Sequence, residues 1–138
     1  MSRENVDIIR ELFRAIELGD AAGVLRRYDP AIVIREHSES LPYGGVFRGT
    51  AGAVRHMRRW ARTWRRSAGI KNVIKPTFID AGDRVVAIWR HRADSVGGAH
   101  LDAPIAGLYT LRDGLITEAQ MFHADTVTIL RFLDTLVR

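Results

Sequence analysis

The strongest constraint on the fold comes from residues 100–125, where two apolar runs of strand character flank Asp113-Gly114. Both residues of this dipeptide accept a positive φ angle, so it favours a two-residue hairpin turn. Counting outward from this turn, without any irregularity, places Ala106 opposite Met121. The other opposed pairs in this register are Arg112 and Leu115, Thr110 and Thr117, Leu108 and Ala119, and Pro104 and His123.

One face of this hairpin has the character of a small-molecule site. Side chains alternate between the two faces of a strand, and the opposite face, with Glu118 and Gln120, is more polar. In this register the apolar face carries Ala106, Leu108, Met121 and His123, and it extends to His100 and Asp102. Binding sites are usually apolar and concave, with a few ionisable groups. We therefore expect this face to line a pocket.

The first half of the chain predicts two helices, a strand, a loop and a third helix. Apolar spacing and turn residues give helices at 3–18 and 21–29, the second capped by Asp20. A β-branched strand at 31–37 precedes a loop at 38–50 that is rich in proline and glycine. Thr50 is a candidate cap for a helix over roughly 51–67, whose expected buried stripe is Val54, Met57, Ala61, Trp64 and Ala68.

The second half predicts antiparallel strands and a closing helix. Strands at 70–79 and 84–93 are joined by the turn at 80–83, and Asp125 can cap a last short helix. Successive strands joined by tight turns form a curved antiparallel sheet, and the helices must cover one of its faces. We expect a single α+β domain over residues 1–138, shaped as a cone with an open mouth.

Composition excludes several classes of function. The chain has no cysteine, so disulfides, thiolate nucleophiles and cysteine-ligated metals are excluded. The charged start, MSRENVDIIRELF, lacks the apolar core of a signal peptide, and no run approaches the roughly 20 apolar residues of a membrane span. These features predict a cytoplasmic protein that is not inserted in a membrane.

The order of elements and four segments resemble the nuclear transport factor 2-like (NTF2-like) superfamily, and most closely its ketosteroid-isomerase-like and SnoaL-like members. The four segments are LGD at 18–20, LPYGGVFRG at 41–49, GDRVVAIWR at 82–90 and LRDGLITEAQMFHADT at 111–126. The resemblance implies a cone of strongly curved sheet packed against N-terminal helices. It also implies a homodimer formed through the outer sheet surface, for which Phe122 and Ile116 are candidates. This fold serves many functions, both enzymatic and non-enzymatic.

Only some of the catalytic residues known in this superfamily have a counterpart in this chain. Steroid isomerases use a tyrosine and a protonated aspartate as oxyanion donors, and those positions fall on Leu12 and Ala106. Their catalytic base falls near Glu36, the only matching carboxylate. SnoaL-like polyketide cyclases use an acid/base aspartate with a nearby histidine, and His123 and Asp125 lie in the corresponding region. The substitutions argue against steroid isomerisation by the usual mechanism.

Four residues are candidates for proton transfer. His123 ends the apolar face, and an imidazole suits acid/base chemistry near neutral pH. Glu36 shares a strand face with Ile32 and Ile34, where a carboxylate is expected to have a raised pKa and could act as a base, and His91 shares one with Trp89. Asp125 either caps the last helix or orients His123. The structural alternatives are a core histidine for His123 and an ion pair with a neighbouring arginine for Glu36.

The remaining candidates would line the ligand. Tyr43 belongs to the expected loop near the entrance, and Trp60 borders the buried stripe of its helix. The expected ligand contacts are Tyr43, Trp60, Trp89, His100, Asp102, Ala106, Leu108 and Met121. A metal held by His91, His100 and His123 is disfavoured because the chain lacks HxH and HxxxH spacing. We therefore expect no metal and no cofactor.

The leading hypothesis is a small enzyme that isomerises, cyclises or dehydrates a hydrophobic, carbonyl-bearing molecule by acid/base catalysis. One alternative is a protein that binds such a molecule without turnover. Another is a dimerisation or nucleic-acid-associated module that uses the arginine-rich segment 55–66, RHMRRWARTWRR. Charge runs on amphipathic helices are usually solvated faces, so we do not expect nucleic acid to be the partner.

Overall fold

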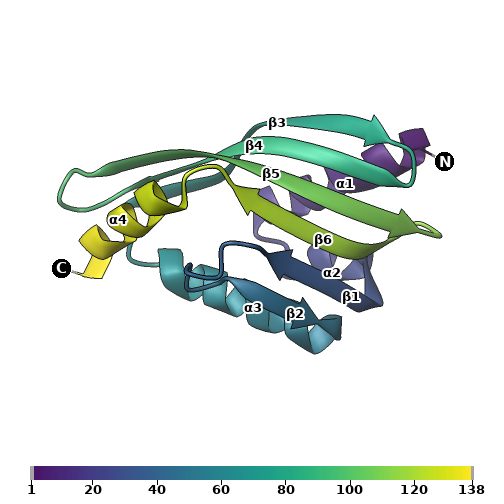
Figure 1. Cartoon of the computed structure of the whole chain (residues 1–138), viewed down its shortest axis with the longest axis horizontal. Helices are drawn as coiled ribbons and strands as arrows, with labels where there is room; N and C mark the ends of the chain where they lie inside the picture. Colours follow the sequence, from purple (N-terminus) through teal and green to yellow (C-terminus); the bar gives the residue numbers. More distant parts are fainter. Residues whose placement is uncertain (1, 138) are drawn as a thin grey trace.

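The computed structural model describes residues 2–137, which form four helices and six strands (Figure 1). Its elements are, in chain order, α1 (Ser2–Leu18), α2 (Ala21–Arg27), β1 (Tyr28–Glu36), β2 (Gly45–Arg48), α3 (Gly49–Trp64), β3 (Gly69–Ala81), β4 (Arg84–Asp94), β5 (His100–Arg112), β6 (Leu115–His123) and α4 (Thr126–Val137). The α+β class, the curved sheet and the covering N-terminal helices are confirmed. None of the helices within residues 2–137 is both long and apolar enough for a membrane crossing.

All six strands belong to one open sheet in the order β2-β1-β6-β5-β4-β3. The expectation of a wholly antiparallel sheet is wrong at one place, because β1 pairs with β6 in parallel. The expectation of a loop at 38–50 is also wrong in part. Residues Gly45–Arg48 form the edge strand β2, paired antiparallel to β1. These two pairings bring β1 beside the end of the hairpin.

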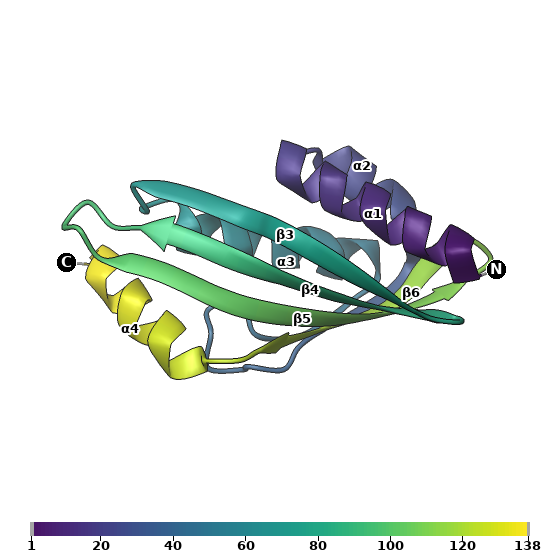
Figure 2. The same ribbon diagram turned by 90° about the horizontal axis from the view of Figure 1, so that it is seen from above.

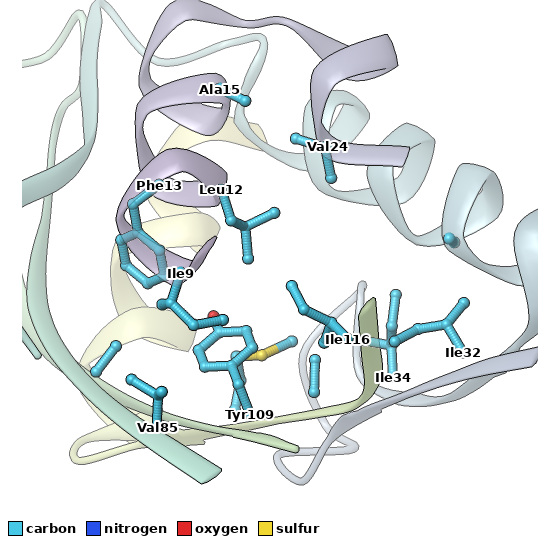
Figure 3. Packing of buried hydrophobic residues seen from close by; sticks show 14 of the residues in the cluster. Ile9, Leu12, Phe13, Ala15, Val24, Ile32, Ile34, Val85, Tyr109 and Ile116 are labelled. Atoms are coloured by element: carbon cyan, nitrogen blue, oxygen red, sulfur yellow. The ribbon is translucent and has the colours of Figure 1, made fainter. Parts of the chain in front are cut away.

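The hydrophobic core lies between α1 and the inner face of the sheet. Figure 2 shows α1 and α2 on one side of the strands, and Figure 3 shows Ile9 and Leu12 of α1 close to Tyr109. Ile9 and Leu12 are fully buried. Burying an aliphatic side chain of this size contributes about 1.5–3 kcal/mol to folding. Leu12 therefore serves packing at the position where the resemblance would require a tyrosine.

The register of the β5–β6 hairpin differs from the predicted one. The turn is confirmed, since Asp113 and Gly114 both have positive φ, 52° and 79°. The register then shifts by one residue between Thr110 and Leu111, and beyond this irregularity Ala106 pairs with Phe122 instead of Met121. A one-residue slip exchanges the faces of all following side chains relative to the partner strand.

The corrected register changes which β5 side chains face inward. Met121 and His123 lie on the inner face as expected, but their partners there are Gly107 and Ile105. Ala106 and Leu108 belong to the outer face instead, next to exposed Phe122. Ile116, expected on the outer surface, is fully buried.

Helix α3 also differs in its buried stripe. It begins at Gly49, so Thr50 lies inside the helix and does not cap it. Trp64 is buried as predicted, whereas Ala61 and Ala68 are exposed. The side turned toward the protein interior instead follows Ala53, His56, Met57, Trp60 and Trp64. The six arginines of this segment are exposed or bordering solvent, as expected for a solvated face.

Helix α4 covers the end of the sheet where we expected an open mouth. Asp125 caps it, because its carboxylate accepts a hydrogen bond from the Thr128 backbone N–H at 3.0 Å. Figure 1 shows α4 near the last turn of α3. Its apolar side chains form a second hydrophobic cluster with residues of the loop before β2 and of α3, β4 and β5. The buried members are Leu41, Tyr43, Trp64, Ala93, Leu101, Ala103, Ile129, Phe132 and Leu133. The interior is therefore closed at this end.

Candidate functional site

A buried carboxylate bridged by two imidazoles is the centre of the site. Glu36 is the last residue of β1, and only 4% of its side chain is exposed. Its Oε2 accepts a hydrogen bond from His123 Nε2 at 2.9 Å, and its Oε1 accepts one from His56 Nε2 at 3.1 Å. The three side chains come from β1, β6 and α3. The parallel pairing that places Glu36 beside Met121 brings His123 within reach, because His123 lies two residues further along the same face.

The bridging hydrogen bonds keep Glu36 ionised. The raised pKa that we expected for Glu36 is wrong. Burial alone would raise the pKa of this carboxyl, but the hydrogen bonds from His123 and His56, together with their charge when protonated, outweigh that effect and lower the pKa below its ordinary value. An ionised carboxylate only accepts hydrogen bonds, so Nε2 of each imidazole carries the shared hydrogen. Glu36 thereby selects one tautomer of neutral His123.

That tautomer leaves His123 Nδ1 as an available base. The Nδ1 atom is buried and has no hydrogen-bond partner. In the neutral ring it carries a lone pair, since the hydrogen is on Nε2. A carboxylate that holds an imidazole in this way orients the ring and stabilises the imidazolium formed when the ring accepts a proton. His123 is therefore built as a general base whose free nitrogen lies in the protein interior.

His91 is a second buried imidazole whose ring nitrogens are unpaired. It lies on the inner face of β4 with 2% of its surface exposed, and both ring nitrogens lack partners. Its ring centroid is 4.3 Å from that of Trp64 and 5.9 Å from that of Trp60. Burial lowers the pKa of His91 to about 4, and His123 contributes to this effect when it is protonated. A neutral imidazole has one N–H donor, so His91 can donate a hydrogen bond to a ligand oxygen.

Aromatic side chains surround the imidazoles. The Tyr43 ring centroid is 6.1 Å from that of His123 and 6.3 Å from that of Trp64. Burial and the nearby Glu36 carboxylate raise the pKa of Tyr43 well above its ordinary value, so its hydroxyl stays protonated and can donate. Phe132 of α4 stacks on Trp64 with the centroids 6.0 Å apart. The arrangement offers flat apolar walls and a few buried polar atoms.

The structure brings most of the predicted inner-face residues together at this end. These are His123, Glu36, His91, Tyr43, Trp60 and Met121. Trp89 also faces inward, but it lies toward α1, with its ring 4.9 Å from that of Phe13. It therefore belongs to the main core rather than to the surroundings of His123.

Three predicted polar residues lie outside the site. Asp125 caps α4, and its two carboxylate oxygens bond to the backbone N–H and the hydroxyl of Thr128, whereas His123 is oriented by Glu36. His100 and Asp102, both expected to contact the ligand, bond to other residues instead. His100 is exposed and bonds to Asp94, whereas Asp102 forms ion pairs with Arg90 at 2.7 Å and Arg92 at 3.2 Å. These contacts lie on the outer face, because the register shift reverses the inward direction that we predicted for this part of β5.

His56 is the functional candidate that sequence reasoning missed. It stands among six arginines, and the predicted stripe of α3 passed through Val54 and Ala61 instead. The spacing of Ala53, His56, Met57, Trp60 and Trp64 is also helical and is the one that the structure uses. An uncharged imidazole within a basic helix is the signal that could have identified this side.

Comparisons with known proteins identify the family of this chain. The model of the SnoaL-like domain matches residues 9–119. The chain belongs to the SnoaL-like domain family. Membership supports a role for this SnoaL-like protein in small-molecule chemistry or binding. The search of curated proteins gave no match.

Solved structures confirm the fold of this SnoaL-like protein. The chain is similar to TerC, crystallised with polyporic acid, with 23% identity, a TM-score of 0.80, and coverage of 95% of this chain and 98% of TerC. An NTF2-like protein of unknown function from Burkholderia pseudomallei has 22% identity, a TM-score of 0.80, and coverage of 94% and 97%. A candidate polyketide cyclase from Xanthomonas campestris has 16% identity, a TM-score of 0.73 and coverage of 98% of both chains.

Proposed function

We propose that this SnoaL-like protein catalyses proton transfer on a hydrophobic, carbonyl-bearing small molecule, in an isomerisation, cyclisation or dehydration that uses no cofactor. The observation that carries the proposal is the unpartnered, buried Nδ1 of His123, on a ring held by Glu36. Buried polar atoms are nearly always hydrogen-bonded, so an exception at a candidate site indicates a place for a ligand. The two nitrogens of His91 are further exceptions in the same region.

The proposed reaction begins when His123 Nδ1 removes a proton from the carbon next to the carbonyl. The imidazolium formed is stabilised by the Glu36 carboxylate, which lies 2.9 Å from Nε2. Negative charge develops on the ligand oxygen, which accepts hydrogen bonds from the neutral imidazole of His91 and the hydroxyl of Tyr43. In an isomerisation His123 then returns the proton to another carbon of the ligand. In a cyclisation the carbanion attacks a second carbonyl carbon and the proton goes to that carbonyl oxygen, and in a dehydration the proton goes to a hydroxyl group, which leaves as water.

The surroundings favour a flat, apolar substrate. Trp60 and Trp64 flank His91, and Tyr43 lies against His123, so aromatic surfaces border each candidate polar atom. Aromatic rings pack well against other planar groups. The likeness in fold to TerC, which was crystallised with polyporic acid, and to a candidate polyketide cyclase supports the same class of ligand.

A deuterium-incorporation assay tests the proposal without knowledge of the product. The protein is incubated in D₂O with a panel of aromatic ketones, enones and β-dicarbonyl compounds, and incorporation next to the carbonyl is followed by mass spectrometry. We expect catalysed incorporation for at least one compound. It should be lost in His123→Gln and retained in His100→Gln, whose exposed imidazole lies outside the site. Equal incorporation by both variants would contradict a catalytic role for His123.

A non-catalytic binding protein is the second candidate function. The closed interior favours this function, because His91, Tyr43 and Trp64 are each almost fully buried. A ligand enclosed by such residues would dissociate slowly, which suits retention better than turnover. A binding protein would take up a panel compound without catalysing deuterium incorporation. Its affinity would fall in Ala103→Trp, since Ala103 is the cross-strand partner of His91 on β5. Ala106 does not serve this test, because it faces outward.

We also propose that the outer face of the sheet pairs with a second copy of the chain. Ile88, Ala106 and Phe122 form a continuous apolar row across β4, β5 and β6. Ile88 and Phe122 are each 44% exposed. Adjacent exposed apolar residues on a sheet commonly mark a contact surface. The proposed pairing leaves the interior site of each copy intact.

A further inference from the structure

We infer that His56 is the point at which the buried His123–Glu36 pair exchanges protons with solvent. The inference deepens the proposed function, because a base that accepts a proton must be able to lose or regain it. Solvent contact rises along the chain of hydrogen bonds: 3% of the His123 side chain is exposed, 4% of Glu36 and 14% of His56. The three groups therefore connect the interior to the surface through two hydrogen bonds.

The direct route from His123 to solvent is closed. Its Nδ1 is buried, and Tyr43 lies beside the ring in the core formed with Trp64 and α4. The other nitrogen, Nε2, is occupied by Glu36 Oε2. His56 is situated differently, on α3 beside Phe47 of the edge strand β2, with the ring centroids 5.0 Å apart. Proton exchange through His56 needs no opening of α4.

The charged group of the relay lies at its centre. Glu36 contacts two imidazoles, that of His56 on α3 and that of His123 on β6. Its negative charge, together with burial, raises the pKa values of Tyr28, Tyr43 and Tyr109. The three phenols stay neutral. Among these groups the carboxylate carries the negative charge, and it lies between the two imidazoles.

Each step of the relay moves one proton and conserves charge. The His123 imidazolium gives its Nε2 proton to Glu36 Oε2, which leaves neutral His123 and a neutral carboxylic acid. Rotation of this carboxyl group exchanges its two oxygens and turns the O–H toward His56. Nε2 of the other His56 tautomer, with its hydrogen on Nδ1, accepts the proton, and the resulting imidazolium releases the Nδ1 proton to water. The reverse sequence delivers a proton to His123.

Exchange of the His123 Nε2–H with water tests the relay by ¹⁵N-edited NMR, without any substrate. The test variant is His56→Gln, whose amide N–H can still donate to Glu36 but cannot relay a proton. We expect exchange at least about tenfold slower than in the unmodified protein. The control is His37→Gln, since His37 follows Glu36 in sequence but bonds to Gln120 and stacks on exposed Phe122. The control should leave the rate unchanged.

The sign of the change separates a relay from a purely structural role. If His56 only supported the fold, its replacement would increase local opening and accelerate exchange. Unchanged or faster exchange in His56→Gln would therefore overturn the inference. A measurement on the unmodified protein covers the case in which the variant does not fold. The relay requires the His123 proton to exchange faster than the backbone amide hydrogens of neighbouring β6, and exchange as slow as theirs would also overturn it.

The relay and the proposed function fail separately. Slow exchange in His56→Gln without any catalysed deuterium incorporation would leave the relay standing and remove the enzymatic proposal. Conversely, the enzymatic proposal would stand and the relay would be removed if catalysed deuterium incorporation depended on His123 while His56→Gln left the exchange of the His123 proton unchanged.

Discussion

His123 and Glu36 form a hydrogen bond of 2.9 Å although 87 residues separate them in the sequence. The contact forms because β1 and β6 are parallel neighbours in the sheet, which places the ends of both strands at one edge. Both side chains are almost fully buried, so the hydrogen bond is protected from competing water. A carboxylate placed in this way orients an imidazole and stabilises its charged form.

Replacing Glu36 by glutamine is expected to reduce both stability and proton transfer. The amide cannot accept hydrogen bonds from both imidazoles at once, so one buried group loses its partner, at a cost of about 1–3 kcal/mol in the free energy of unfolding. Catalysed deuterium incorporation should fall by about 10²-fold or more, because His123 loses its orienting charge. Urea unfolding and the deuterium assay measure the two effects.

The matched control for this change is Glu118→Gln. Glu118 lies on the outer face of β6 and forms an ion pair of 3.7 Å with Arg35, both partly exposed. Such pairs contribute about 0–1 kcal/mol, so the control should stay close to the unmodified protein in stability and activity. Equal losses in both variants would contradict a special role for Glu36.

Acidification is expected to destabilise the fold, in part through His91. The pKa of His91 is about 4 in the folded protein, against 6.5 in the unfolded chain. Between these values the unfolded chain binds the additional proton, so stability falls as the pH is lowered from 6.5 toward 4. The full contribution is about 3 kcal/mol. Glu36, whose folded pKa is lowered, adds a further loss below pH 4.5.

Urea unfolding at several pH values checks this expectation. The His91→Leu variant removes the titrating ring and should show a clearly smaller loss of stability between pH 6.5 and 4.5 than the unmodified protein. The remaining loss at lower pH includes the contribution of Glu36. An unchanged dependence in the variant would mean that His91 is not held neutral by burial.

Gly107→Ala is expected to disturb the inner face of the sheet. A Cβ atom at this position would lie 2.7 Å from the Tyr109 ring and 3.0 Å from the Trp89 ring. Overpacking of this kind costs about 1–3 kcal/mol. Gly97→Ala is the control, because a Cβ atom there meets only the Ser95 hydroxyl oxygen at 3.9 Å. Thermal unfolding of both variants measures the difference, and equal midpoints would show that the inner face has spare room.

Charge on the outer face is expected to weaken the proposed dimer. Phe122→Asp places a carboxylate in the apolar row with Ile88 and Ala106, and burying it against a second copy would require desolvation. Sedimentation over a range of concentrations should show a dissociation constant raised by about tenfold or more. Val96→Asp, in the exposed turn between β4 and β5, is the control. A monomer at all concentrations of the unmodified protein would remove this proposal.

The local elements could be predicted because they depend on neighbouring residues. The apolar spacing from Val6 to Ile16 indicates α1, and Asp20 and Asp125 cap the helices that follow them. Asp113-Gly114 forms the expected hairpin turn, and strict alternation in β4 places His91 inward. Capping, turn formation and alternation each act within a few residues, so the chain alone shows them.

Long-range pairing decided the rest of the site. The irregularity between Thr110 and Leu111 turned Ala106, Leu108 and Asp102 away from the interior, and counting from the turn cannot detect one extra residue in a strand. The packing side of α3 depended on β1 and β2, which selected His56 over Ala61. The sequence by itself thus determined the elements other than β2, and it determined that His123 ends the apolar face of its strand. Only the tertiary structure decided that Glu36 and His56 meet it, because non-local strand pairing and helix docking depend on the whole core.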